Sequence, residues 1–352
     1  MKLETLLPLG KVDPGLREPG TPFDIHTVGE QAQLVESLGY DAVMFEETKH
    51  DPFMVMALAA AATRTVGIGT AVAIAFPRSP AVTAMSAWSL QRLSRGRFIL
   101  GLGTQVRGHI QRRFGFKWSA PGPWMREYVG AVREIWRAWQ TGEQPSFHGD
   151  HYDISLTVPL FDPGPIEHPQ IPIHLAAVNS YMCEVAGEVA DGIRPHPVCT
   201  ADYIREVMWP AVRKGAEKVG RTIPDFSVSI KPLIATARTP ELLAPKIKDV
   251  RARVAFYAST PAYRAAFEAH GLSDLADELK HLSRAQRWEE MPDYITDDVL
   301  HTYACVGTYD EIGDVLAARY GGIVTNAEFS IAVENEQDAQ TLTGLIDRLR
   351  AA

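Results

Sequence analysis

A dense group of charged side chains follows the second apolar segment of the chain. Residues 46–52 read Glu-Glu-Thr-Lys-His-Asp-Pro. A carboxylate and an imidazole at the end of a strand can exchange protons with a substrate. Asp51 and Pro52 are explained by the start of a helix, because aspartate is a preferred N-cap and proline a preferred first residue. Glu47 and His50 therefore remain as the candidates for acid–base catalysis.

Three later segments carry small or polar residues that would suit a flat, anionic ligand. Residues 69–75 are small and apolar, so a planar ring could lie on the backbone, although a core strand has the same composition. Residues 101–113 combine glycines, which permit close backbone approach, with arginines that could attract an anion or form a solvated face. Asn179 or Ser180 is a natural N-cap, and the free amides of that helix start could bind a phosphate.

Two further side chains have both a functional and a structural explanation. His196 stands between two prolines, where it is either a positioned catalytic group or a buried, hydrogen-bonded histidine. Arg78 could hold a substrate anion or pair with an acid at a strand end. The other histidines do not show the paired spacing of metal ligands, so we expect no metal site.

Composition excludes several functional classes. The net charge of −8 lacks the basic excess of a nucleic-acid binder. The three cysteines are far apart, which indicates neither a disulfide framework nor a zinc site and favours a reduced, cytoplasmic setting. No segment reaches the roughly 18 uncharged apolar residues of a membrane span. The first residues read as a strand rather than a signal peptide.

The elements that position these groups alternate between strand and helix. Such alternation without a compositional break predicts one (β/α)8 barrel over residues 1–352, with a doubly wound open sheet as the alternative. We expect insertions at about 142–170, as a small hairpin, and at about 240–300, as charged helices. In such a barrel the active site lies at the carboxyl ends of the strands. The expected strands are 2–8, 41–46, 65–74, 97–103, 171–176, 192–195, 226–235 and 323–332.

Several motifs resemble a known family. Residues 39–43, 69–72, 93–103 and 186–192 resemble the bacterial luciferase-like superfamily, and the likeness spans essentially the whole chain. Other segments look like its actinobacterial branch that depends on coenzyme F420, a deazaflavin. These segments are 50–53, 109–114, 255–263 and Val306-Gly307-Thr308.

The resemblance implies a coenzyme across the barrel mouth and a non-proline cis peptide bond at Ala71–Val72 behind its central ring. The amides of Val178, Asn179 and Ser180 would hold its phosphate, and the basic run 107–113 could meet its acidic tail. The coenzyme-binding residues implied in this way are Thr70, Ala71, Val72, Gly103, Thr104, Gln105, His109, Val178, Asn179 and Ser180.

The sequence also departs from related sugar-phosphate dehydrogenases. Those proteins place Asp-His at the end of strand two, where this chain has Glu47-Thr48 with His50 two positions on. They also carry an acid near the position of Val106. The pattern does not match alcohol dehydrogenase chemistry at these positions.

The function that the resemblance implies is hydride transfer between C5 of F420 and a small organic substrate. The alternatives are a two-component monooxygenase that uses reduced FMN and oxygen, and a barrel that binds coenzyme without catalysis. The family likeness suggests a homodimer packed through helices near strands two and three. We expect neither nucleic acid nor membrane as a partner. The loops 10–23, 142–170 and 240–300 would set the substrate specificity.

Overall fold

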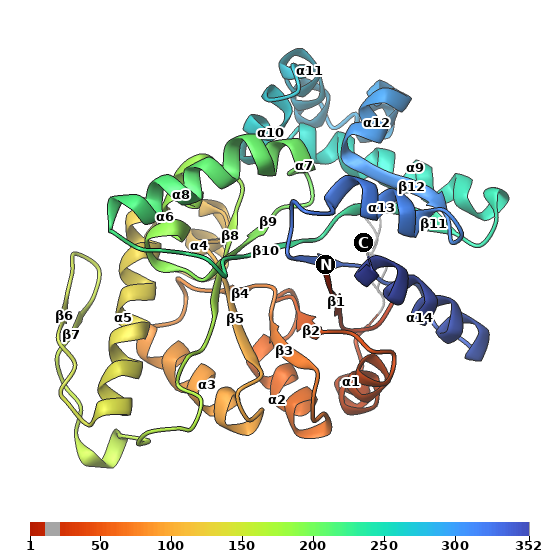
Figure 1. The fold of residues 1–352 in the computed structure, drawn as a ribbon. Coiled ribbons are helices and arrows are strands. Elements are labelled where there is room, and N and C mark those ends of the chain that lie inside the picture. Colours follow the sequence, from red (N-terminus) through yellow and green to blue (C-terminus); the bar gives the residue numbers. More distant parts are fainter. Residues whose placement is uncertain (11–21, 352) are drawn as a thin grey trace.

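Eight parallel strands form a closed barrel in the computed structural model, which describes residues 1–10 and 22–351 (Figure 1). The order around the barrel follows the sequence, and β3 pairs with β5 to close the ring. The predicted barrel is therefore confirmed and the open sheet is excluded. The barrel strands are β1 (Lys2–Leu6), β2 (Ala42–Phe45), β3 (Gly67–Thr70) with its continuation β4 (Ala73–Ile74), β5 (Phe98–Gly103), β8 (Ile173–Ala177), β9 (Gly192–Pro195), β10 (Ser227–Ile230) and β13 (Asn326–Glu328).

Helices surround this barrel, and two of them begin at residues that the sequence marks as caps. Asp51 accepts hydrogen bonds from the first amides of α2, and Asn179 accepts one from Met182 at the start of α6. α5 buries the apolar stripe from Trp124 to Trp139. The main outer helices are α1 (Val28–Ser37), α2 (Pro52–Ala62), α3 (Pro80–Leu93), α5 (Pro121–Thr141), α6 (Ser180–Val189), α8 (Trp209–Lys218), α13 (Ile312–Tyr320) and α14 (Glu336–Ala351).

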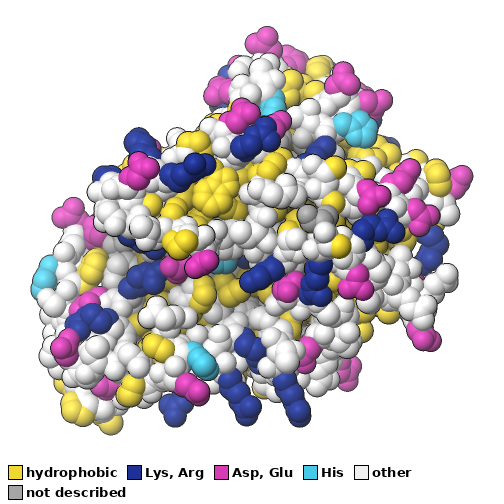
Figure 2. Space-filling view, viewed as in Figure 1, with side chains coloured by type: hydrophobic (Ala, Val, Ile, Leu, Met, Phe, Trp, Pro, Cys, Tyr) yellow, Lys and Arg dark blue, Asp and Glu magenta, His cyan; other side chains and the backbone are white. Residues whose placement is uncertain are grey.

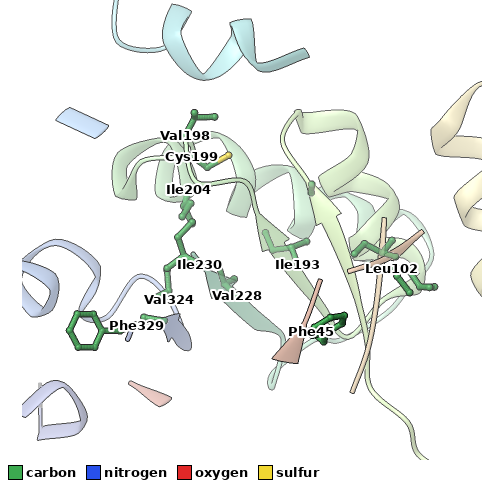
Figure 3. Close-up of a cluster of buried hydrophobic side chains, with 14 of the residues drawn as sticks. Phe45, Leu102, Ile193, Val198, Cys199, Ile204, Val228, Ile230, Val324 and Phe329 are labelled. Carbon is green, nitrogen blue, oxygen red and sulfur yellow. The ribbon is translucent and has the colours of Figure 1, made fainter. Parts of the chain in front are cut away.

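The apolar core lies partly inside the barrel and partly between the barrel strands and the surrounding helices. All four residues of β2 are buried, as expected of a parallel strand that is covered on both faces. Figure 3 shows side chains from several strands in one cluster, among them Phe45, Leu102, Ile193 and Val228. This packed interior holds the strand ends in fixed positions, and those ends carry the polar residues of interest.

The seventh expected strand, 226–235, is wrong as a single element. The chain forms β10 in the barrel, breaks, and continues as β11 (Leu233–Ala237). β11 leaves the barrel and pairs in parallel with β12 (Ala304–Thr308), which was not expected as a strand. Pro232 stands at the break, and proline has no amide hydrogen to donate to a sheet. The last barrel strand is also shorter than the expected 323–332.

Both expected insertions have the predicted type of structure. Segment 142–170 contains the antiparallel hairpin of β6 (Phe147–His148) and β7 (Asp153–Ile154), which projects from one side of the barrel (Figure 1). Segment 240–300 is helical and lies at the top and upper right of the view (Figure 1). Its helices are α9 (Pro240–Ala258), α10 (Arg264–Glu268), α11 (Ser273–Arg284) and α12 (Asp297–Tyr303).

Most of the proposed specificity loop 10–23, including Pro14, Gly15, Pro19 and Gly20, lies outside the described residues. Within the described ranges, no helix combines the length and the apolar character that crossing a membrane requires.

Candidate active site

A cavity of about 810 Å³ opens at the carboxyl ends of the barrel strands. Seven of the ten expected coenzyme-binding residues, together with Glu47, line it. The seven are Ala71, Val72, Gly103, Thr104, Gln105, Val178 and Asn179. The helical insertion contributes Tyr257 and Tyr263, so the cavity lies between the barrel mouth and α9 with its following turn.

The other three of the ten expected coenzyme-binding residues do not line the cavity. Thr70 is fully buried behind the wall, where its hydroxyl donates to the Gly101 carbonyl (2.6 Å) and accepts from the Gly101 amide (2.9 Å). His109 and Ser180 are exposed and do not line the cavity. Thr70 therefore joins β3 to β5 instead of facing a ligand.

The wall next to β3 contains the cis peptide bond that the resemblance implied. The bond between Ala71 and Val72 is cis, which confirms the expectation. It separates β3 from β4, and the Ala71 amide still donates to the Phe45 carbonyl (2.8 Å). Opposite this bulge, a Cβ on Gly103 would lie 2.6 Å from a methyl group of Val72. The missing side chain at Gly103 thus leaves the backbone open to the cavity.

Glu47 lines the cavity and also fixes the bulge. Its Oε2 accepts hydrogen bonds from the amide of Ile74 (2.7 Å) and from Nη1 of Arg78 (2.6 Å). Arg78 also donates to Asp51 (2.8 Å). Of the two roles expected for Arg78, binding a substrate anion or pairing with an acid at a strand end, the structure shows the pairing. His50 does not line the cavity, and its ring lies 5.5 Å from that of Phe23.

The start of α6 and the segment after β5 form another part of the rim. Asn179 uses its side chain to cap the helix, with Oδ1 accepting from the Met182 amide (3.0 Å). Val178 and Asn179 line the cavity beside this helix start. From the other segment Arg107 reaches the cavity, whereas Arg113 donates to the Thr48 carbonyl (2.9 Å).

A buried ion pair, of which Arg194 lines the cavity, was not among the candidates. Arg194 on β9 donates to Glu4 on β1 (2.5 Å), and Glu4 also accepts from the hydroxyl of Ser229 on β10 (2.6 Å). Burial alone would raise the pKa of Glu4, but the charge of Arg194 and these hydrogen bonds hold it below its ordinary value. Nη1 of Arg194 is buried and has no hydrogen-bond partner within the described ranges.

A second charged group lies beside this pair. Lys231, just after β10, donates to Glu46 (2.8 Å) and lies 3.7 Å from the carboxylate of Glu328 at the end of β13. Burial raises the pKa of Glu328 to about 7, although Lys231 acts in the opposite direction. A carboxyl group with this pKa can hold or release a proton near neutral pH.

Aromatic rings cover the side of the cavity under the insertion. The His196 ring stacks on Tyr263 at 4.0 Å and meets Tyr257 edge-on at 4.7 Å. Burial, followed by the charge of Lys231, lowers the pKa of His196 to about 3. The imidazole is therefore neutral at pH 7 and forms part of a flat, uncharged wall. Over the face drawn in Figure 2, basic and acidic side chains are intermixed.

Sequence comparison identifies the family. Residues 2–326 match the luciferase-like monooxygenase family. The chain belongs to this family. It is 41% identical to an uncharacterised protein of Mycobacterium tuberculosis, a match that covers 86% of this chain and 89% of that protein. It is also 31% identical to an F420-dependent glucose-6-phosphate dehydrogenase of Intrasporangium calvum, which covers 78% of this chain and 84% of the relative.

Solved structures of this luciferase-like fold match the whole chain. The F420-dependent tetrahydromethanopterin reductase of Methanopyrus kandleri has a TM-score of 0.73 at 15% identity and covers 99% of this chain and 98% of its own. EDTA monooxygenase of Chelativorans sp. BNC1 has a TM-score of 0.70 at 16% identity and covers 100% of this chain and 93% of its own. These likenesses support the fold.

The residues of this luciferase-like chain fit a flat coenzyme with a phosphate. The bulge at Ala71–Val72 and the bare backbone of Gly103 form one wall of the cavity, and residues at the start of α6 line the same cavity. Sequence reasoning found this part because glycines and caps leave local signals. Sequence reasoning missed Arg194, Lys231 and Glu328. The only feature in the sequence that could have indicated them is that a charged residue stands at the end of an apolar strand, at a position that points inward.

Proposed function

We propose that this protein is an F420-dependent oxidoreductase that transfers a hydride between the deazaflavin and a small organic substrate. The observation that carries the proposal is the cavity wall in which the Ala71–Val72 bulge faces Gly103 at the carboxyl ends of the strands. F420-dependent relatives support the choice of coenzyme. When bound, the deazaflavin supplies or accepts the hydride at C5.

The chain's own residues would bind and orient the coenzyme. The backbone of Ala71, Val72 and Gly103 would support the ring system, with Thr104 and Gln105 at its edge. The amides at the start of α6, near Val178, Asn179 and Ser180, would hold the phosphate, because a helix N-terminus favours an anion. Arg107 and the basic residues that follow, including His109, would lie along an acidic tail.

Glu47 and His50 remain our proposed catalytic residues, and the contacts of Glu47 indicate that its role would be to position the substrate. Its carboxylate ties the loop after β2 to β4 through Ile74 and Arg78. Glu47→Gln keeps the side-chain size but loses the ion pair with Arg78. We expect the double variant Glu47→Gln/His50→Ala to lose turnover and to keep coenzyme binding. Unchanged turnover would remove both residues from the mechanism.

Two alternatives remain to be separated from this proposal. An FMN-dependent two-component monooxygenase is favoured by the description of the family and by the structural likeness to EDTA monooxygenase. A barrel that binds coenzyme without catalysis would have the same cavity. The three functions differ in which coenzyme binds, in oxygen uptake and in hydride exchange.

The deciding experiment is a titration of the protein with F420 and, separately, with FMN, followed by quenching of tryptophan fluorescence. Trp118 lines the cavity and would report binding. We expect F420 to bind more tightly, and reduced F420 to be re-oxidised by an organic acceptor without oxygen uptake. Tight FMN binding with oxygen uptake would instead establish the monooxygenase. F420 binding without hydride exchange against carbonyls, alcohols and enones would establish the non-catalytic barrel.

A variant of the wall provides the control for that titration. Gly103→Val would push methyl groups into Val72 and the space of the ring, so we expect the affinity for F420 to fall at least tenfold. Gly344→Ala is the matched control, because it lies in α14 and a Cβ there meets nothing within 4 Å. Equal affinities in the two variants would contradict the placement of the coenzyme.

We also propose a homodimer formed through α2 and α3. These neighbouring helices expose four large apolar side chains, Met54 (66%), Leu58 (45%), Val82 (47%) and Met85 (51%). A second copy of the chain would bury them, which is favourable in proportion to the apolar area removed from water. Light scattering should show a dimer, and Met85→Glu should give a monomer of unchanged secondary structure. A monomeric wild type would refute this assembly.

A further inference from the structure

Glu328 occupies a position in the barrel that faces the proposed coenzyme wall. It is the last residue of β13, and Gly103 is the last residue of β5. Four strand-to-strand steps separate β13 from β5 in either direction around the closed ring, so the two strands lie on opposite sides. Both residues line the cavity. A substrate lying over the coenzyme ring would therefore have Glu328 on its other side.

The charges around Glu328 come from four other strands or strand ends. Lys231 follows β10 and lies 3.7 Å from its carboxylate, and Glu46 follows β2 and pairs with Lys231. Arg194 on β9 is already paired with Glu4, which lies beside Glu328 in register on β1. Each cation thus has a partner carboxylate without Glu328. A protonated Glu328 leaves this group of five neutral, and an ionised Glu328 adds one uncompensated negative charge.

The structure holds Glu328 ready to carry a proton. Burial, together with the negative charges of Glu46 and Glu4, raises its pKa, whereas Lys231 and Arg194 lower it, and the result is about 7. The side chain is 13% exposed, so it touches the cavity while most of it is excluded from water. Its carboxyl can therefore exchange a proton with a bound molecule and recover it through the cavity.

We propose that Glu328 is the acid–base residue that transfers the proton accompanying hydride transfer, and that the substrate is a flat, uncharged carbonyl compound such as an enone, ketone or quinone. This inference rests on the proposed function. In the direction of reduction, C5 of the reduced coenzyme provides the hydride to carbon. The O–H bond of Glu328 breaks, and its proton goes to the substrate oxygen or α-carbon. The products are the reduced substrate, the oxidised coenzyme, one proton that the ring nitrogen of the coenzyme would release to water, and a Glu328 carboxylate that takes up a proton from water.

The uncharged nature of the substrate follows from the same pairing. Of the cations that line the cavity, Arg194 lies on a barrel strand and Lys231 directly follows one, and carboxylates already pair with both. An anionic group placed there would have to compete with Glu4 or Glu46. The stacked rings of His196 and Tyr263, with His196 neutral at pH 7, provide a flat wall for an uncharged planar molecule. Lys231 would act as a positioning residue that holds Glu328 near its working pKa.

The first test needs no coenzyme. Infrared spectra of the protein as a function of pH should show a protonated-carboxyl C=O band that disappears with an apparent pKa near 7. Glu328→Gln should remove this band, and the exposed Glu334→Gln, a matched control, should leave it. Lys231→Met should move the transition to higher pH, because it removes a cation that favours the ionised form. A wild type without a carboxyl band titrating near neutral pH would overturn the proposal.

The second test follows single-turnover re-oxidation of reduced F420 by the uncharged acceptors cyclohexenone, acetone and benzoquinone and by the anionic acceptor pyruvate. The wild-type rate should fall as the pH rises through about 7, because the reduction needs the protonated form of Glu328. Glu328→Gln should slow the reaction by about 100-fold or more while the Kd for F420 stays unchanged, and Glu334→Gln should react like the wild type.

The outcomes separate this inference from the function on which it rests. A wild type that neither binds nor re-oxidises F420 would refute the proposed function and, with it, the role of Glu328. An active wild type with an equally active Glu328→Gln variant would refute the role of Glu328 alone. Preference for anionic over uncharged acceptors would overturn the substrate class. If Glu328→Gln does not fold, the infrared titration of the wild type and Lys231→Met still decides whether a carboxyl titrates near neutral pH beside Lys231.

Discussion

The buried ion pair between Glu4 and Arg194 gives a stability prediction that the structure quantifies. Both side chains are buried, at 2% and 9% exposure, and Ser229 donates to the second oxygen of Glu4. Glu4→Gln retains the shape and an acceptor for Ser229, so it removes mainly the negative charge. The guanidinium of Arg194, whose Nη1 already has no partner in the described structure, is then left uncompensated.

Removing one member of a buried pair costs about 3–5 kcal/mol, because the remaining charge stays out of water. Unfolding entropy is about 2.1 cal/mol/K per residue, or about 0.7 kcal/mol/K for 352 residues, so Tm should fall by about 4–7 °C. Glu4→Gln/Arg194→Met removes both charges and should recover to within about 1 kcal/mol of the wild type. Urea denaturation and thermal unfolding at pH 7 measure both effects.

An exposed ion pair supplies the matched control. Lys214 donates to Glu184 at 2.7 Å, but the lysine is 71% exposed, so Glu184→Gln should cost less than about 1 kcal/mol. The reasoning would be refuted if Glu4→Gln were no more destabilising than Glu184→Gln. It would also be refuted if the double variant were as unstable as Glu4→Gln, because the loss would then not come from an uncompensated charge.

Three further predictions concern packing and pH. Gly187→Ala should lower the free energy of unfolding, measured by urea denaturation, by more than about 3 kcal/mol, because the new Cβ would lie 2.0 Å from a backbone carbonyl oxygen of α8. Gly344→Ala should instead raise the free energy of unfolding by about 0.5–1 kcal/mol. The pKa of His196 is lowered to about 3 in the folded protein, so the free energy of unfolding decreases as the pH is lowered below about 6.5. His196→Phe should make the decrease in the free energy of unfolding between pH 7 and pH 4.5 smaller by about 1–2 kcal/mol. The carboxylate of Glu36 accepts hydrogen bonds from the three backbone amides of residues 64–66, and these bonds outweigh the effect of burial and lower its pKa to about 2. Glu36→Gln should therefore reduce the free energy of unfolding by about 1–3 kcal/mol at pH 7 and by little below pH 2 in the same assay.

Local patterns predicted most of the fold. Apolar runs of strand length alternate with helical periodicity, and this alternation is a property of neighbouring residues. Asp51 before Pro52 and Asn179 before α6 mark helix starts because caps act within one turn. The cis bond at Ala71–Val72 was located through the family resemblance, since no local pattern of small residues requires it.

The break after β10 shows where local patterns were insufficient. Residues 226–235 are apolar enough for one strand, but Pro232 interrupts hydrogen bonding and the chain turns out of the barrel. β11 then pairs with β12, about 70 residues later in the chain, across the helical insertion. A pairing over such a separation leaves little signal in either segment alone.

The sequence by itself determined the barrel, the caps and the small residues of the cavity wall, because each depends on neighbours within a turn or a strand. Only the tertiary structure decided which charged side chains meet inside the barrel. Glu4, Arg194, Lys231 and Glu328 come from four strands or strand ends that span 324 positions, from residue 4 to residue 328. Closing the ring brings these strands together, and the alternation of side chains along each strand decides which residues point inward. The pairing that neutralises three of these charges and leaves Glu328 with a raised pKa exists only after the ring has closed.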